Sequence, residues 1–369
     1  MDEWIIPGRI IGVIGDNVDA LYFTQTALRM GYQVYVYNED EMNMAGSISD
    51  EHWIGSLTDR GQLKQFAQHV NCLVYTSKNI GNEMIGMMMN ETYIPQGDEI
   101  LSLAQDKALQ KITFDSLNIN VAPYSTVLSK EDVKEAAEST GYPALISNNF
   151  SKDYDYARTI ISNEEEIEQL SDEMLEMTCI QESFIGAQTE LNITVAVDVQ
   201  GQVHPVALCE TEYDKNRLKS TMNPPEIEDQ LALEAYRITY QIAESFDYIG
   251  ILSLDFLISE SGILYVKEIS PFTTLAGINT FDAQNLTQYE LFVRTVTNWS
   301  VPEIKHHEAS LSFPFYSGQF EKVVELLINY PEGKVYYYNE TKNSHPFGHV
   351  TFTSEDQYEI QEVREKLYF

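Results

Sequence analysis

The first forty residues hold two short apolar runs separated by a segment with helical periodicity. Residues 10–15 form an apolar run that ends in glycine, and residues 34–37 form a second run. The segment between them, about 18–30, has the pattern of a helix and is followed by Gly31. A strand, a helix and a second strand in this order predict a βαβ unit, which implies a parallel sheet. The apolar run at 72–75 supports that sheet, so we expect an α/β fold.

Downstream of residue 98 the pattern changes to a helix and then to a series of strands. The helix carries Lys107 and Lys111. The main strand candidates are 191–199, 203–209, a hairpin of 251–258 and 263–269, and 335–338 and 349–352 near the C-terminus. With 369 residues and 43% hydrophobic content, the chain can form several packed units. We expect a domain at 1–97, a central body at 98–302 with a smaller lobe at about 121–182, and a small C-terminal unit at 303–369.

The charge balance argues against two classes of partner. The chain has 57 acidic residues against 23 Lys and Arg, a formal net charge of −34. Such a surface repels nucleic acid and anionic membranes, because both are bound through clustered basic side chains. The three cysteines show no paired spacing, no apolar run reaches membrane-spanning length, and the first residues do not resemble a signal peptide. These features predict a cytoplasmic protein that binds neither nucleic acid nor membrane.

Three short motifs follow one another along the chain. Gln105-Asp106-Lys107 opens a helix, Gln181-Glu182-Ser183-Phe184-Ile185 precedes Glu190, and Lys267-Glu268-Ile269-Ser270-Pro271 ends the hairpin. In this order they resemble the skeleton of an ATP-grasp enzyme, and in particular the family of 5-(carboxyamino)imidazole ribonucleotide synthase. That family carboxylates aminoimidazole ribonucleotide with ATP and bicarbonate, and the resemblance runs nearly end to end. It implies an α/β ATP-grasp fold with an N-terminal parallel-sheet domain and a small β-rich C-terminal domain.

Two carboxylates of the hairpin are candidate metal ligands. Asp255 lies on its first strand and Glu268 near the end of its second. Carboxylates on adjacent strands can share one divalent ion, and Mg²⁺ prefers hard oxygen ligands together with nucleotide phosphates. From the residues alone, a solvent-facing acidic pair on an acidic protein is the favoured interpretation. The resemblance implies the metal role, although the first position is normally Glu in the family and Asp255 is one methylene shorter.

A second set of residues is matched by the resemblance to the ATP site. Lys107 corresponds to a lysine that reaches the nucleotide phosphates, and Glu190 to the residue that binds the ribose hydroxyls. The strand and linker of the adenine pocket correspond to Gln181, Glu182, Phe184 and Ile185. A lysine supplies a movable positive charge for phosphate, and a carboxylate accepts hydrogen bonds from two vicinal hydroxyls. Without the resemblance, Lys107 is interpreted as a solvent-exposed lysine near a helix start, whereas the strand residues and Glu190 are equally compatible with ordinary polarity at a strand end.

Many positions that hold phosphate or substrate in the family carry different chemistry here. Ser147 replaces a second lysine, and 151–157 replaces a glycine-rich loop over the phosphates. On the substrate side, Tyr213-Asp214 replaces His-Arg, Phe272 replaces Arg, His345-Pro346 replaces Arg-Lys, and Ile14-Gly15-Asp16-Asn17-Val18-Asp19 replaces Gly-Gly-Gly-Gln-Leu-Gly. Each lost charged hydrogen bond to phosphate costs roughly 1.5–3 kcal/mol. Several such losses together would cripple the binding of an anionic substrate.

These joint replacements favour a catalytically degenerate protein with a binding or regulatory role, in which the binding of ATP and Mg²⁺ is weak or lost. The alternative is an active ATP-grasp ligase that joins a carboxylate to an amine. Such a ligase would either carboxylate aminoimidazole ribonucleotide or use a changed substrate. A small-molecule nucleotide is the expected partner, and the resemblance implies a homodimer.

Overall fold

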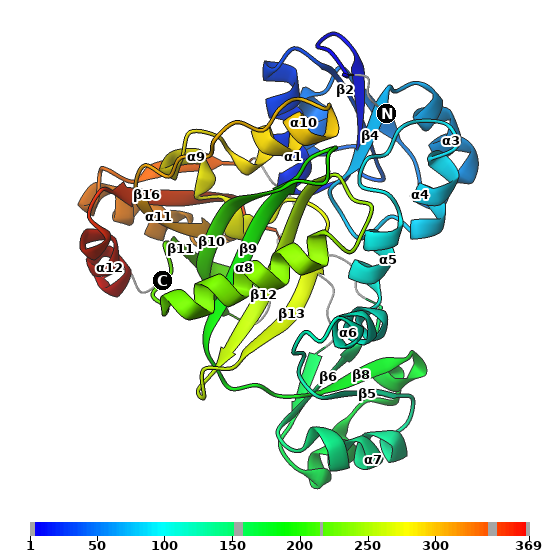
Figure 1. Cartoon of the computed structure of the whole chain (residues 1–369), viewed down its shortest axis with the longest axis vertical. Helices are drawn as coiled ribbons and strands as arrows, with labels where there is room; N and C mark the ends of the chain where they lie inside the picture. The colour runs from blue at the N-terminus through cyan, green and yellow to red at the C-terminus, as the bar shows by residue number, and fades with distance from the viewer. Residues whose placement is uncertain (1–3, 151–157, 215–216, 339–344, 367–369) are drawn as a thin grey trace.

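The chain folds around three β-sheets, which Figure 1 shows with the N-terminal sheet at the top, a large sheet in the centre and a small sheet at the bottom. This is a computed structural model, and it describes residues 4–150, 158–214, 217–338 and 345–366. The predicted α/β architecture, with its N-terminal parallel sheet, is confirmed. Within the described residues, no helix is long and apolar enough to cross a membrane.

The N-terminal sheet is wholly parallel, as the βαβ pattern predicts. Its strands lie in the order β3 (Glu51–Ile54), β2 (Gln33–Asn38), β1 (Ile10–Ile14) and β4 (Cys72–Tyr75). Helix α1 (Val18–Arg29) connects β1 to β2, and Asn17 caps it by accepting a hydrogen bond from the backbone N of Ala20 at 3.0 Å. The other helices of this region are α2 (Met44–Ile48), α3 (Arg60–Gln68) and α4 (Asn82–Met88).

The large sheet is antiparallel and combines the middle of the chain with its C-terminal part. Its strand order is β13 (Leu264–Ser270), β12 (Gly250–Ser259), β9 (Ala187–Val197), β10 (Val203–Asp214), β11 (Arg217–Asn223), β14 (Ala309–Phe315), β16 (Gly348–Ser354) and β15 (Lys334–Tyr337). The three C-terminal strands therefore extend this sheet and do not build one of their own. The boundaries expected at 97 and 302 stay predictions.

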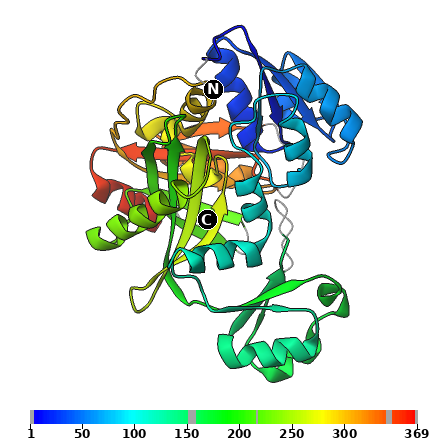
Figure 2. The same cartoon turned by 45° about the vertical axis from the view of Figure 1, so that its right-hand side comes forward.

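The small sheet forms the lower lobe in Figures 1 and 2. Its antiparallel order is β5 (Tyr124–Val127), β8 (Cys179–Ser183), β6 (Ala144–Asn148) and β7 (Arg158–Ile161). It is accompanied by α7 (Lys130–Thr140) and the short 3₁₀ helices η1 (Glu164–Gln169) and η2 (Asp172–Glu176). The loop at 151–157, singled out in the sequence, lies outside the described residues.

Helices cover both faces of the large sheet and tie the sheets together. The remaining helices are α5 (Glu99–Gln105), α6 (Lys107–Ser116), α8 (Asp229–Ala243), η3 (Leu275–Gly277), α9 (Thr280–Ala283), α10 (Gln288–Val296), α11 (Phe320–Asn329) and α12 (Gln357–Lys366). Helix α8 packs on β9, β10 and β12, and α10 packs on β9 and β12 and also contacts α1. Helix α10 therefore fixes the N-terminal sheet against the large one. Strand ends from both sheets then line the same pocket.

Candidate active site

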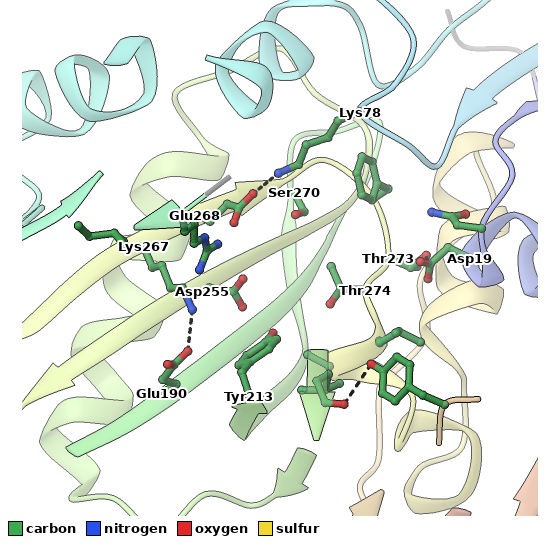
Figure 3. Close-up of a pocket in the computed structure, with 18 of the residues that line it drawn as sticks. Asp19, Lys78, Glu190, Tyr213, Asp255, Lys267, Glu268, Ser270, Thr273 and Thr274 are labelled. Atoms are coloured by element: carbon green, nitrogen blue, oxygen red, sulfur yellow. Dashed lines mark hydrogen bonds and ion pairs between the residues drawn. The ribbon is translucent and has the colours of Figure 1, made fainter. Parts of the chain in front are cut away.

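The two candidate metal ligands lie opposite each other on the hairpin of β12 and β13. Asp255 pairs with Glu268 in the antiparallel register, so the strand geometry itself brings them together. Asp255 accepts a hydrogen bond from Nδ2 of Asn192 on the neighbouring strand β9 at 2.7 Å. Glu268 forms an ion pair with Lys78, which follows β4 of the N-terminal sheet. Both carboxylates line the pocket drawn in Figure 3.

The surroundings of the two carboxylates shift their pKa values in opposite directions. Burial raises the pKa of Asp255 to about 6, because the attraction of Lys267 and the hydrogen bond from Asn192 offset it only in part. Burial acts in the same sense on Glu268. There, however, Lys78 and then Lys107 and Arg158 outweigh it, and they lower the pKa of Glu268 to about 2. Glu268 is therefore held as an anion beside a cluster of basic groups.

Lys107 lies at the start of α6 and reaches the small sheet. Its Nζ donates a hydrogen bond to Oγ of Ser147 on β6 at 2.8 Å. Burial lowers the pKa of Lys107 to about 8, against the attraction of Glu268 and Glu182. Arg158, the first residue of β7, pairs with Ser147 across the two strands. Two basic residues thus converge on the position where the resembled family has its second lysine.

A pocket of about 280 Å³ opens between the small sheet and the end of the hairpin. Five of the six residues predicted to bind ATP line it: Lys107, Glu182, Phe184, Ile185 and Glu190. Gln181 is not among the lining residues, because its side chain is fully buried and its Nε2 donates to Oγ1 of Thr140 at 2.8 Å. Its alternation with Glu182 on β8 explains the difference, since neighbouring strand residues face opposite sides of a sheet.

Glu182 and Glu190 are each held by a lysine inside this pocket. Lys111 on α6 forms an ion pair with Glu182 at 2.5 Å, and only 4% of the Lys111 side chain is exposed. Lys267 on β13 forms an ion pair with Glu190 on β9 at 2.7 Å, and its Nζ lies 4.8 Å from the centre of the Tyr213 ring. Both carboxylates are therefore oriented before any nucleotide binds.

A larger pocket of about 740 Å³ adjoins the first, and the two share lining residues that include Arg158, Phe184, Glu190, Lys267 and Glu268. The rest of its wall combines aliphatic side chains with polar and aromatic ones, which are Asn17, Asp19, Lys78, Tyr213, Asp255, Ser270, Phe272, Thr273, Thr274 and Tyr316. Figure 3 labels seven of the residues named here around this space, namely Asp19, Lys78, Tyr213, Asp255, Ser270, Thr273 and Thr274. Two binding spaces that meet at Glu268 suit a reaction between a nucleotide and a second small molecule.

The substrate-side positions singled out in the sequence are only partly brought together. Tyr213, Phe272 and Asp19 line the larger pocket, whereas Asp214 and His345 are not among its lining residues. His345 is buried elsewhere, with 5% of its surface exposed.

Three basic residues of the site were missed by the sequence reasoning, namely Lys78, Lys111 and Arg158. Lys78 follows the carboxyl end of a buried parallel strand, which is a place where α/β proteins carry ligand-binding residues. That signal could have pointed to it. Arg158 and Lys111 carry no comparable signal, because their roles depend on contacts made across sheets.

Comparison with known protein families divides the chain into two parts. Residues 9–105 match the model of the ribonucleotide synthetase preATP-grasp domain, and residues 112–289 match the model of the ATP-grasp domain. Among curated proteins, the N5-carboxyaminoimidazole ribonucleotide synthase of Bacillus subtilis (strain 168) is 26% identical over 365 residues, which cover 98% of this chain and 96% of that protein.

Solved structures agree with this match over the whole chain. The N5-carboxyaminoimidazole synthetase of Staphylococcus aureus complexed with ADP is 25% identical, with a TM-score of 0.92 and coverage of 99% of this chain and 98% of that one. The N5-carboxyaminoimidazole synthase of Aspergillus clavatus, in complex with ADP and 5-aminoimidazole ribonucleotide, shares the fold at 18% identity, with a TM-score of 0.88 and coverage of 98% and 99%. The resemblance read from the motifs is confirmed, and the chain belongs to the N5-carboxyaminoimidazole ribonucleotide synthase family of ATP-grasp proteins.

Proposed function

We propose that this protein is an active ATP-dependent ligase. In its first step, the γ-phosphoryl group of ATP is transferred to an oxygen of bicarbonate or of another carboxylate, which gives ADP and a carboxy or acyl phosphate. In its second step, an amine attacks the carbonyl carbon, the bond to the phosphate oxygen breaks, and inorganic phosphate leaves. The observation that carries the proposal is the convergence of Lys78, Lys107 and Arg158 on Glu268, where the two pockets meet.

The nucleotide is proposed to bind in the smaller pocket. Phe184 and Ile185 would contact the adenine, and Glu182 lies beside them on the same wall. Glu190 would accept hydrogen bonds from the ribose hydroxyls, with Lys267 holding it in place. Lys107 would contact the phosphates, since its ammonium group lies between Ser147 and the carboxylates. Gln181 would act through its main chain or not at all.

Mg²⁺ fits the carboxylate pair of the hairpin. Asp255 and Glu268 are hard oxygen donors on adjacent strands, and Mg²⁺ is usually held by one or two carboxylates together with nucleotide phosphates. Among the described residues, no group of three or more His, Cys, Asp and Glu forms an alternative metal site. The ion would neutralise charge on the transferred phosphoryl group. Lys78 adds a fixed positive charge at the same carboxylate.

The loss of basic residues was the main reason to favour a degenerate protein. Two basic groups that the sequence reasoning had not placed, Arg158 opposite Ser147 and Lys78 beside Glu268, compensate for part of that loss. Solved structures of related synthetases in complex with ADP also argue for an active ligase. We therefore prefer the active ligase. Weak nucleotide binding, a homodimer and a cytoplasmic location stay predictions from the sequence.

Calorimetric titration with ADP in the presence and absence of Mg²⁺ tests this proposal. We expect saturable binding that needs Mg²⁺ and that Lys107→Ala weakens by at least about tenfold, because a charged hydrogen bond to phosphate is lost. Lys64→Ala is the matched control, since Lys64 is 52% exposed, pairs with Glu91 and lines neither pocket. No ADP binding, or equal binding by Lys107→Ala, would overturn the proposal. Release of phosphate from ATP that depends on bicarbonate or a carboxylate then tests turnover.

A further inference from the structure

We propose that Asn192 is a positioning residue of the metal site, which holds Asp255 so that a single carboxylate oxygen is presented to the ion. The inference rests on the proposed ligase function, because Asp255 and Glu268 are the ligands proposed there for Mg²⁺. Asn192 itself lines neither pocket. Its effect on the ion must therefore pass through Asp255, with which it pairs from the neighbouring strand β9.

The register of the large sheet places the three side chains in one row. Glu268 on β13 pairs with Asp255 on β12, and Asp255 pairs in turn with Asn192 on β9. Directly paired residues have their side chains on the same face of a sheet, so Asn192 stands on the side of Asp255 away from Glu268. Only 1% of the surface of Asn192 is exposed, so water does not compete with it for Asp255 at this side.

The hydrogen bond from Asn192 occupies one oxygen of the carboxylate. Nδ2 of Asn192 donates to Oδ1 of Asp255 at 2.7 Å. Among the described residues no second hydrogen bond reaches the Asp255 side chain, so Oδ2 stays available to an ion. An aspartate side chain turns about two bonds, and a fixed oxygen restricts both. The amide therefore selects the orientation in which Asp255 meets a metal.

Asn192 is itself held by a buried network of hydroxyl groups. Its Nδ2 donates to Oγ of Ser253 at 3.0 Å, and its Oδ1 accepts from the same hydroxyl at 3.1 Å and from Oγ1 of Thr194 at 3.2 Å. Thr194 and Ser253 are 0% and 1% exposed. A metal ligand whose supporting partners are fixed needs little reorientation when an ion binds. The network thus prepares Asp255 before the metal arrives.

A carboxylate that offers one oxygen favours a small ion. Mg²⁺ requires near-octahedral geometry at about 2.0–2.1 Å, whereas Ca²⁺ takes roughly six to eight oxygens and often both oxygens of one carboxylate. Asp255 is also one methylene shorter than the glutamate that is normal in the resembled family, so it has less reach to adjust to a larger ion. We expect the site to prefer Mg²⁺ or Mn²⁺ to Ca²⁺, and Asn192 to be a source of that preference.

Calorimetric titration with ADP in the presence of Mg²⁺ and of Ca²⁺ tests this role. Asn192→Leu keeps the size of the side chain and removes both polar groups. We expect it to weaken ADP binding by about tenfold with Mg²⁺ and by less than about threefold with Ca²⁺, because the smaller ion depends more on fixed geometry. Equal losses with the two ions, or no loss with Mg²⁺, would overturn the inference.

Asn223→Leu is the matched control for this variant. Asn223 is a buried asparagine on β11 of the same sheet, and it lines neither pocket. Its Nδ2 donates to the backbone carbonyl of Leu208, so its loss also removes a buried hydrogen bond. We expect the affinity for ADP to stay unchanged with either ion. A loss in Asn223→Leu equal to that in Asn192→Leu would show a general effect of the sheet and would overturn the inference.

A double-mutant cycle separates positioning from disturbance of the fold. In the background of Asp255→Asn, the further change Asn192→Leu should alter the affinity for ADP with Mg²⁺ by less than about twofold, because the carboxylate on which Asn192 acts is gone. A loss as large as in the wild-type background would show that Asn192 does not act through Asp255.

Failure of this inference and failure of the ligase proposal give different results. If the wild type binds ADP with Mg²⁺ and Asn192→Leu binds it equally well, the positioning role is wrong and the ligase proposal stands. If the wild type binds no ADP, the ligase proposal is wrong, and Mn²⁺ titrated into the protein without nucleotide tests the role through the paramagnetic resonance signal of the free ion. Asn192→Leu should then bind Mn²⁺ about tenfold more weakly. Equal Mn²⁺ affinity in the two proteins, or no Mn²⁺ binding, would overturn the inference.

Discussion

Lys78 and Glu268 form an ion pair that joins the N-terminal sheet to the hairpin of the large sheet. The side chains are 3% and 17% exposed, so the pair is well shielded from water. The backbone carbonyl of Lys78 also accepts a hydrogen bond from Nε2 of Gln105 at 2.7 Å. The position of a proposed metal ligand therefore depends on a residue that lies 190 positions earlier in the chain. This links the stability of the domain contact to the function of the site.

Replacement of this lysine should destabilise the fold. Lys78→Met removes the ammonium group and leaves Glu268 with the more distant help of Lys107 and Arg158. Breaking a buried pair from one side costs about 3–5 kcal/mol, and the remaining basic groups reduce this to about 2–3 kcal/mol of unfolding free energy. Urea unfolding at pH 7.5 measures the effect. The exposed control Lys64→Met should change it by less than about 1 kcal/mol.

The effect of Lys78→Met on the unfolding free energy should depend on pH. The pKa of Glu268 is lowered from its ordinary value of 4.5 to about 2, so the stabilisation is complete above pH 4.5 and is lost as the pH falls toward 2. The difference in unfolding free energy between the wild type and Lys78→Met should therefore be constant from about pH 5 to 8 and narrow below pH 4.5. A difference that widened on acidification would contradict the assigned cause.

Asp255→Asn should stabilise the protein without ligand while it weakens nucleotide binding. Burial raises the pKa of Asp255 from 3.8 to about 6, so stability from the neutral form is complete below pH 3.8 and is lost as the pH rises through 6. At pH 7.5 the variant avoids the cost of a buried charge and should gain about 1–3 kcal/mol, with no gain near pH 4. Its affinity for ADP with Mg²⁺ should fall at least about tenfold. If the variant proves less stable at pH 7.5 than the wild type and than the exposed control Asp247→Asn, the assignment is wrong.

Much of the fold could be predicted because it depends on local patterns. The apolar run before Gly15 and the helix after it lead directly to the parallel unit of β1, α1 and β2. The hairpin of β12 and β13 was visible from two apolar runs and a turn, and its register places Asp255 opposite Glu268. The joining of β14, β15 and β16 to the large sheet could not be read in this way, because it depends on pairings between distant strands.

The site was harder to predict than the fold. Lys107 and Glu190 were found by their place in motifs, yet the partners that orient them, Ser147 and Lys267, come from other elements. Taken alone, Ser147 indicates that the positive charge of the family's second lysine has been lost. Its meaning changes once Arg158 is seen on the neighbouring strand, because a basic residue at one strand position can replace one that is lost at the facing position.

The proposed phosphate contact of Lys107 predicts a pH dependence of nucleotide affinity. Burial lowers the pKa of Lys107 to about 8, and only the protonated form attracts phosphate. The affinity for ADP should therefore fall as the pH rises from about 8 to 9.5. The pKa of Lys107 itself should be higher in the ADP-bound protein than in the free protein. In Lys107→Arg the fall should disappear, since the guanidinium stays charged throughout this range. The two pH profiles coincide if another group causes the dependence.

Ser147→Lys separates nucleotide binding from the choice of substrate. Ser147 is 1% exposed and accepts a hydrogen bond from Lys107. A lysine at this position therefore adds bulk and a third basic group beside Lys107 and Arg158. Without nucleotide the variant should lose about 1–3 kcal/mol of unfolding free energy, whereas Ser139→Lys on the exposed face of α7 should lose little.

With ADP and Mg²⁺ the new ammonium group gains phosphate oxygens, and the affinity of Ser147→Lys should rise by about threefold to tenfold. It should nevertheless not carboxylate 5-aminoimidazole ribonucleotide, because Tyr213 and Phe272 still line the larger pocket in place of the family's histidine and arginine. Calorimetry and a product assay with labelled bicarbonate check the two halves separately. Carboxylation of the ribonucleotide at a rate that rises with nucleotide affinity would mean that this wall does accept a phosphate. The substrate would then be the one found with the Aspergillus clavatus protein, and the differences in the wall would serve another purpose.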